Sequence, residues 1–275
     1  MKQKPRNTKQ KTPKFTSTFV LIVIAILYLP ILLIVLFSFS ENNVVSFSND
    51  FNFGFGLFAA LFNNADIMDA VWHTFLIAVV ASFIATIIAT MAGVGILSMK
   101  QKRRSAIMAL NQLPIINADI VTSFSIVLLF VTLGLTNVGF FKLILAHTLI
   151  ALPFALLMIM PRLRQLDDNL FDAALDLGAT PFRAFLTVII PQLLPAMLNA
   201  FLLGFTLSLD DFAITQYNND DISTISTEVY GAMNRRYIPP EMRALTTIIF
   251  VAIFCILVII NVVIKNKKKE NPQNG

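Results

Sequence analysis

Long apolar runs, separated by short polar or charged segments, dominate the pattern of this chain. A helix needs about 20 residues to cross the roughly 30 Å hydrocarbon core of a bilayer, and runs near that length occur six times. They cover Phe19–Ser40, Thr74–Leu97, Ile107–Leu133, Val138–Met160, Phe185–Leu209 and Ala244–Ile264. The pattern predicts an all-α integral membrane protein with six transmembrane helices.

The third run is too long for one regular span and contains three residues that interrupt it: Pro114, Asn117 and Asp119. Proline lacks the N–H that an inner helical turn needs, and a carboxylate at membrane depth is costly unless something compensates its charge. We therefore predict a broken helix with its break near mid-membrane. Two interpretations of Asp119 stay open: it contacts a cationic substrate, or Asp119 or Asn117 caps the second half-helix.

Composition supports a membrane protein, and the distribution of charge predicts how the chain is oriented across the membrane. With 56% hydrophobic and 13% charged residues, the chain is far too apolar for a soluble domain. Of the 21 Lys and Arg residues, 17 lie in alternate segments: the N-terminal tail, the loops after the second and fourth runs, and the C-terminal tail. The positive-inside rule then predicts that both termini are cytoplasmic. Because the charges lie at membrane edges, nucleic-acid binding is not expected.

These patterns give a simple domain layout. We predict a cytoplasmic basic tail over residues 1–18, a six-helix transmembrane domain over 19–264 with a short polar and amphipathic segment at about 167–191, and a second cytoplasmic basic tail over 265–275. A cleaved signal peptide is the alternative for the first run. That run is longer than the hydrophobic region of such signals and no small-x-small site precedes Glu41, which favours a retained span.

A short amphipathic segment, Asp172–Pro191, lies between long apolar runs and reads DAALDLGATPFRAFLTVIIP. Its Ala173 and Ala174 let another surface approach closely, and Gly178 releases the backbone into a turn. Thr180, followed by a proline, can cap a second short helix. The segment predicts two small helices that meet at an elbow, with an apolar side for a partner to cover.

Acidic residues gather after the fifth run. Asp210 and Asp211 form a pair there, and the ring of Tyr217 is close enough in the sequence to add a cation–π contact to an ammonium group. We interpret this pair as functional. Asp220 and its neighbour are better explained as an ordinary solvated helix end.

Other chemistry is mostly absent from the sequence. No Gly-x4-Gly-Lys stretch is present to hold ATP phosphates. His73 and His147 have no partners at metal-ligand spacing, and the lone Cys255, which excludes an intrachain disulfide, is explained by packing. We expect no catalytic residue, no metal site and no cofactor in this chain.

The elbow carries a resemblance to a known family. The order Asp-Ala-Ala, three residues, Gly178, nine residues and Val-Ile-Ile-Pro is similar to the cytoplasmic signature of ABC importer permeases, Glu-Ala-Ala-x3-Gly-x9-Ile-x-Leu-Pro. Asp172, Val188 and Ile190 are conservative departures from it, and the spacing is kept. Four further stretches resemble the second permease of bacterial spermidine/putrescine importers: Leu27–Ser40, Asn117–Phe130, Leu145–Phe154 and Phe205–Tyr217.

The resemblance implies a function and a set of partners. It implies an ABC importer permease fold in a bacterial cell membrane, with the elbow residues Asp172, Ala173, Ala174, Gly178 and Pro191 coupling the chain to an ATPase dimer that uses ATP and Mg²⁺. A second permease, an extracytoplasmic substrate-binding protein and membrane lipid are the other expected partners. The implied substrate is a polyamine, with Asp119, Asp210, Asp211 and Tyr217 along its path.

Other functions remain open at this stage. Within the family, another cation or small organic solute such as ferric iron, thiamine or an amino-acid derivative is the alternative substrate. An ion-coupled secondary transporter would also have a broken helix and a buried carboxylate, but it would not need the elbow. A membrane scaffold would need neither feature.

Overall fold

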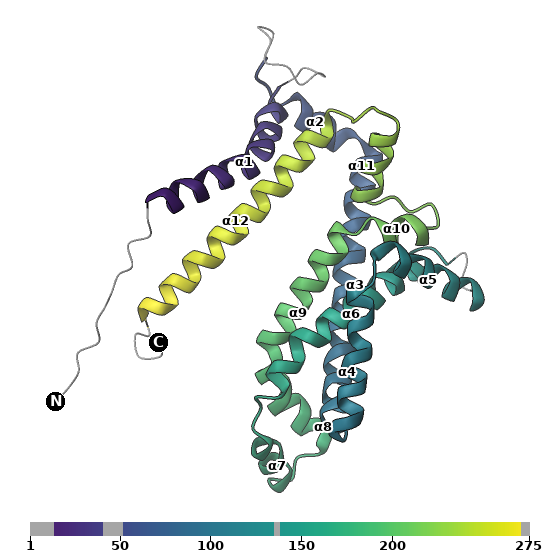
Figure 1. Ribbon diagram of the computed structural model, residues 1–275, viewed down its shortest axis with the longest axis vertical. Coiled ribbons are helices and arrows are strands. Elements are labelled where there is room, and N and C mark those ends of the chain that lie inside the picture. The colour runs from purple at the N-terminus through teal and green to yellow at the C-terminus, as the bar shows by residue number, and fades with distance from the viewer. Residues whose placement is uncertain (1–13, 41–51, 135–137, 271–275) are drawn as a thin grey trace, which may run out of the picture. The chain divides into compact units, whose positions relative to one another are not determined.

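The computed structural model describes residues 14–40, 52–134 and 138–270, and the regular elements in these ranges are helices (Figure 1). The chain divides into two compact units, one made of residues 65–237 and one made of residues 1–64 with 238–275. Residues 1–13 and 271–275 of the two predicted tails lie outside the described ranges, whereas residues 14–18 and 265–270 are helical.

Three long helices form the core of the first unit: α3 (Ala65–Leu97), α6 (Phe140–Leu163) and α9 (Ile190–Asp210) pack against one another. Small residues allow their backbones to approach closely, as is usual between helices in membranes. A Cβ added at Gly204 would stand 3.3 Å from the Cβ of Ser82 and 3.4 Å from that of Ala151. The contact between α9, α3 and α6 therefore depends on glycine at this position.

The predicted break in the third run is present, and its location near mid-membrane stays a prediction. α4 (Gln101–Ile116) and α5 (Asp119–Thr132) are separated by two residues and bent by 109° relative to each other. The capping interpretation is wrong, because the N-cap of α5 is Ala118 and no side chain caps the helix. Asn117 instead donates its amide to the hydroxyl of Thr122, 3.3 Å away.

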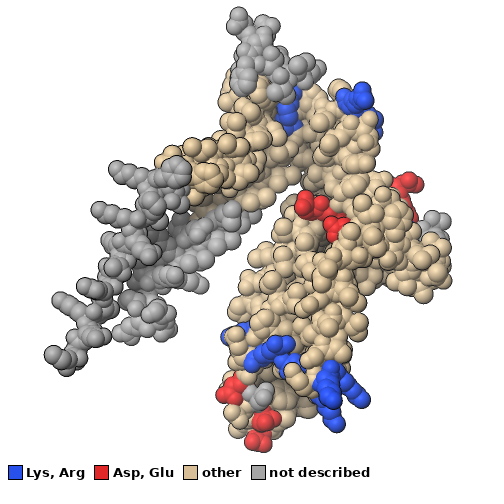
Figure 2. Space-filling model, viewed as in Figure 1, with Lys and Arg blue, Asp and Glu red and all other residues tan. Residues whose placement is uncertain are grey.

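Short helices occupy the two ends of this unit (Figure 1). At one end α7 (Asp168–Asp176) and α8 (Pro181–Ala184) are followed by a wide π-helical turn, η1 (Phe185–Ile189), that leads into α9. At the other end lie α10 (Ala213–Asn218) and α11 (Ile225–Asn234). Lys and Arg side chains gather at the α7–α8 end together with some acidic ones, and further acidic side chains lie near the far end of α9 (Figure 2).

The second unit contains α1 (Lys14–Ser38), α2 (Gly56–Asn63) and α12 (Glu241–Glu270), with α12 packed against both α1 and α2. Arg243 of α12 donates to the carbonyl of Phe37, 3.3 Å away, which ties the start of α12 to the end of α1.

Several helices are long and apolar enough to cross a membrane. Within the described residues these are four, at Thr18–Ser38, Ala65–Leu97, Phe140–Leu163 and Pro181–Asp210, and the bent α4–α5 pair passes the same test when it is counted as one span. The predicted sixth span, Ala244–Ile264, lies within α12. The chain is a multi-pass, all-α membrane protein, and the number six stays a prediction.

Candidate functional site

The predicted acids come together from two helices that are far apart in the sequence. Asp119 is the first residue of α5, Asp210 is the last residue of α9, and Asp211 is the C-cap that follows it. α5 packs against α10, which begins just after Asp211, and the negative charge of Asp119 acts on the Asp211 carboxyl. Asp119 and Asp210 are exposed. Asp119 is therefore near enough to Asp211 for its charge to influence that carboxyl, and the role of the two acids along a substrate path stays a prediction.

Asp211 has an unusual environment for a carboxylate. It lies one residue beyond the span that ends at Asp210, and its side chain is only 11% exposed. Burial raises the pKa of Asp211 to about 6; backbone hydrogen bonds from Thr215 and Ile214 oppose this rise, and the charge of Asp119 adds to it. A cation between the two acids would compensate both the burial and the repulsion. The site therefore suits a positively charged ligand.

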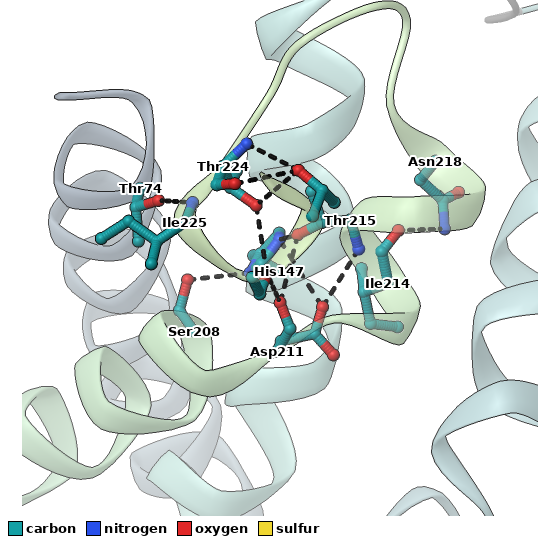
Figure 3. Close-up of polar contacts among 11 residues, drawn as sticks. Thr74, His147, Ser208, Asp211, Ile214, Thr215, Asn218, Thr224 and Ile225 are labelled. Atoms are coloured by element: carbon teal, nitrogen blue, oxygen red, sulfur yellow. Dashed lines mark hydrogen bonds and ion pairs between the residues drawn. The ribbon is translucent and has the colours of Figure 1, made fainter. Parts of the chain in front are cut away.

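The turn that carries Asp211 is anchored on two sides (Figure 3). Its Oδ2 accepts a hydrogen bond from the Thr215 N–H at 3.0 Å, and its backbone carbonyl accepts one from the Ser226 hydroxyl of α11 at 2.8 Å. α11 is tied to α3 in turn, because the Ile225 N–H donates to the hydroxyl of Thr74 at 2.9 Å. The position of the carboxylate is therefore set by contacts that reach back to the core helices.

His147 projects from α6 into the same network (Figure 3). Its Nδ1 lies 2.8 Å from Ser208 Oγ of α9, and its Nε2 lies 3.1 Å from Thr215 Oγ1 of α10 and 4.0 Å from Asp211 Oδ2. The sequence prediction considered His147 only as a metal ligand and did not find this role, because its partners Ser208 and Thr215 are 61 and 68 residues away in the sequence. An ionisable side chain inside an apolar run was the signal that could have found it.

Aromatic rings lie beside the acids. Tyr217 of α10 is partly exposed, and its ring centroid is 4.5 Å from that of Phe124 of α5. Phe212, next to Asp211, packs on Tyr230 of α11 with centroids 4.2 Å apart. The faces of such rings attract ammonium groups, so α10 offers aromatic as well as acidic contacts to a cation.

Asp220 has a structural role that the sequence did not suggest. It forms an ion pair with Lys142 at 2.9 Å and accepts the Gly139 N–H at 3.0 Å, so it is no ordinary solvated helix end. Burial acts to raise the pKa of Asp220, but the hydrogen bonds from Lys142 and Gly139 and the charge of Lys142 outweigh it and lower the pKa. Asp220 thus holds the start of α6 to the loop between α10 and α11, apart from the Asp119–Asp211 site.

The predicted elbow is present, with each turn explained by local chemistry. Asp167 caps α7 by accepting the Asn169 N–H at 3.0 Å. At the other end, Gly178 has φ of +86°, and the Gly178 and Ala179 N–H groups donate to the carbonyls of Leu175 and Ala174, the pattern of a Schellman motif.

The second half of the elbow begins with the predicted cap. Thr180 accepts the Arg183 N–H at 3.4 Å, and Pro181 occupies the first turn of α8. Pro191 lies in the first turn of α9 directly after the π-helical turn, where it cannot donate to the carbonyl four residues earlier.

The outer face of the elbow is apolar and uncovered in this chain. Leu177 is 89% exposed and Phe182 is 72% exposed. Asp172 and Ala173 of the signature are also exposed. Large apolar side chains in such a patch usually mark an interface. The predicted docking role of the signature residues stays a prediction.

The inner side of the elbow faces a cavity of about 880 Å³. Phe171 and Asp172 of α7 line it together with Arg104 of the first turn of α4 and Arg164, the C-cap of α6. The elbow is therefore not packed solidly against the core and has room to shift. In the described part of the chain, no group of three or more His, Cys, Asp or Glu side chains is arranged to hold a metal ion.

Comparisons with known proteins agree with this architecture. Residues 85–269 match the family described as binding-protein-dependent transport system inner membrane component. The chain is 30% identical over 248 residues to the spermidine/putrescine transport system permease protein PotC of Haemophilus influenzae, covering 88% of this chain and 93% of that protein. It is 32% identical over 234 residues to the putrescine transport system permease protein PotI of Escherichia coli, covering 82% of each.

Solved structures support the fold alone. The chain aligns with a chain of a bacterial ABC transporter involved in the import of the acidic polysaccharide alginate at a TM-score of 0.64 and 15% identity, covering 92% of this chain and 94% of that one. The MetNI methionine ABC transporter aligns at a TM-score of 0.53 and 19% identity, over 73% of this chain and 93% of that one. By its sequence match over more than half its length, the chain belongs to the family of binding-protein-dependent transport system inner membrane components.

Proposed function

We propose that this chain is a permease subunit of an ATP-driven ABC importer that carries polyamines, spermidine or putrescine, into the cell. The observation that carries the substrate class is the largely buried carboxylate of Asp211, which lies just before the helix that bears Tyr217 and within electrostatic reach of Asp119 at the start of α5. The names of the relatives, which include spermidine/putrescine and putrescine transport permeases, support the same class.

The chemistry of the site matches a polyamine. Spermidine and putrescine carry ammonium groups joined by short apolar chains, so they need negative charge at intervals and apolar or aromatic contact between. Asp211 supplies a carboxylate that is expensive to keep charged without a cation, and Asp119 and Asp210 add exposed carboxylates beside it. The ring of Tyr217 can cover an ammonium group or an adjacent methylene.

Energy for transport comes from partners in this proposal. A dimer of ATPase subunits, using ATP and Mg²⁺, docks on the elbow formed by Asp172, Ala173, Ala174, Gly178 and Pro191. The exposed Leu177 and Phe182 and the absence of a phosphate-binding loop in the sequence support this. A second, related permease completes the pore, and an extracytoplasmic binding protein delivers the substrate.

The elbow end faces the cytoplasm, as do both termini. The gathering of Lys and Arg side chains at the α7–α8 end supports this orientation (Figure 2), and so does the location of 17 of the 21 basic residues in alternate segments of the sequence. Asp211 then lies toward the outer side, near the far end of α9 from the elbow.

The elbow supplies the lever of an alternating-access cycle. Closure of the ATPase dimer shifts the elbow, and the shift passes through η1 into α9, which carries Asp210 and Asp211 at its other end. Since η1 and α9 form a continuous helical connection between the two sites, movement at the elbow changes the surroundings of the acids. The cavity behind α7 leaves room for that movement.

Two alternatives make different predictions. Another cation or small organic solute would use the same lever with a different site. An ion-coupled secondary transporter would also use a buried carboxylate, but it has no need of an elbow with an exposed apolar face. The elbow favours the importer over the secondary transporter.

Labelled spermidine and putrescine uptake tests the proposal in cells that lack this chain and retain its partners. Wild type restores uptake, whereas Asp211→Asn, present in the membrane in equal amount, does not. Asp221→Asn is the matched control, because it makes the same chemical change at an exposed loop carboxylate. Failure of the wild type to restore polyamine uptake would exclude the substrate, and equal loss in both variants would exclude the special role of Asp211.

A further inference from the structure

We propose that His147 is a positioning residue for the cation site: it does not touch the substrate, but fixes the Asp211 carboxylate through Thr215. This inference rests on the proposed function, since it assigns a role within the same site. It follows from the way one buried ring joins three helices (Figure 3).

The first step is the place of the ring. His147 stands on α6 and is 3% exposed, with Ser208 of α9 on one side and Thr215 of α10 on the other. Asp211, 4.0 Å from the ring, is the acid that contacts it among the described residues. A buried polar ring in an apolar span is costly unless its nitrogens are satisfied, and here both are.

The second step is the direction of the hydrogen bonds. In the tautomer with its proton on Nε2, His147 donates to Thr215 Oγ1 at 3.1 Å, and the Thr215 hydroxyl can then donate to the Asp211 backbone carbonyl, 3.5 Å away. This direction is the same whether the ring is neutral with its proton on Nε2 or carries both protons. With this assignment, the Ser208 hydroxyl donates to Nδ1 when the ring is neutral, and His147 acts as a donor toward the Asp211 turn.

The third step is the effect on the carboxylate. Thr215 contacts Asp211 twice, because its N–H also donates to Oδ2 at 3.0 Å. A fixed Thr215 side chain holds the first turn of α10 in place. The N–H of that turn sets the orientation of the Asp211 carboxylate. A 1 Å displacement of a group in a binding site can cost a large factor in rate, so loss of the His147 contact should weaken transport without removing any group that meets the substrate.

A pair of substitutions separates positioning from packing. In His147→Gln the side-chain amide N–H can stand where Nε2 stood and donate to Thr215. In His147→Asn the shorter amide reaches only the Nδ1 position, toward Ser208. Positioning through Thr215 therefore predicts that Gln preserves function and Asn does not, whereas a role in packing or in the Ser208 contact predicts no such order.

The experiment measures initial rates of labelled spermidine uptake in cells that contain all the partners, with the amount of each variant in the membrane determined in parallel. We expect His147→Asn to lower the rate about three- to tenfold, the effect of one or two hydrogen bonds of ordinary net strength, and His147→Gln to stay within about twofold of wild type.

A double-mutant cycle completes the test. Thr215→Val keeps the shape and removes the hydroxyl, so His147→Asn combined with Thr215→Val should be no slower than the slower single variant. A normal rate for His147→Asn, equal loss for Gln and Asn, or full additivity in the double variant would overturn the inference while leaving polyamine transport intact. Absence of spermidine uptake by the wild type would overturn the proposed function and, with it, this role.

Discussion

Replacing Gly178 by aspartate is the sharpest perturbation of the elbow. Gly178 ends α7 with φ of +86°, and a Cβ added there would meet nothing within 4 Å. The substitution therefore strains the backbone without creating a clash. Its effect should be confined to the angle between α7 and α8.

The size of the effect follows from that conformation. A side chain in the left-handed region costs about 1–2 kcal/mol, which changes the ratio of two conformations about five- to thirtyfold. The Schellman hydrogen bonds of Gly178 and Ala179 hold the native angle, and both depend on this φ. We expect Gly178→Asp to reduce polyamine uptake by about that factor while the amount of protein in the membrane stays the same.

A matched control is available in Gly134, which has φ of +74° and nothing within 4 Å of its Cβ position. Gly134→Asp introduces comparable strain at the end of α5, away from the elbow. Labelled polyamine uptake and membrane content are measured for both variants. Uptake at the wild-type rate in Gly178→Asp, or an equal loss in Gly134→Asp, would refute the coupling role.

Three further predictions concern packing, charge and the aromatic contact. Gly204→Leu should overpack the core and cost about 1–3 kcal/mol, seen as a lower unfolding temperature of the purified protein in detergent, whereas Gly95→Leu, with nothing within 4 Å of its Cβ position, should not. Asp220→Asn should cost up to about 1 kcal/mol by breaking the ion pair with Lys142. The pKa of Asp220 in the folded protein lies below its ordinary value of 3.8, so wild type is more stable than the variant above pH 3.8. This difference disappears as the pH falls through the folded-state pKa, and a difference that persists at lower pH would contradict the prediction. Tyr217→Leu should lower spermidine uptake about two- to thirtyfold, equivalent to about 0.5–2 kcal/mol, and Tyr217→Phe should not; equal effects would exclude the ring.

Local chemistry made much of the fold predictable. The apolar runs gave the long helices, Pro114 and Asn117 located the break before α5, and Thr180 with its following proline gave the start of α8. Each of these features depends on residues close together in the sequence, where helix propensity and capping decide the outcome. Gly178 likewise predicted the turn that ends α7.

Long-range contacts were not predictable in this way. The role of His147 depends on Ser208 and Thr215, and the ion pair of Asp220 depends on Lys142, 78 residues away. The early start of α3, at Ala65 instead of the predicted Thr74, has a local cause instead, because polar residues continue the helix beyond the apolar run. The contacts of His147 and Asp220 follow from the packing of the helices, which a single sequence does not display.

ATP-driven accumulation of labelled spermidine in proteoliposomes tests the central claim most directly. The vesicles contain this chain, its partner permease and the ATPase subunits, with the binding protein added outside. Accumulation that requires ATP, the binding protein and this chain is the predicted result. Spermidine uptake that proceeds without ATP, or ATP hydrolysis with no accumulation of spermidine or putrescine, would contradict the account.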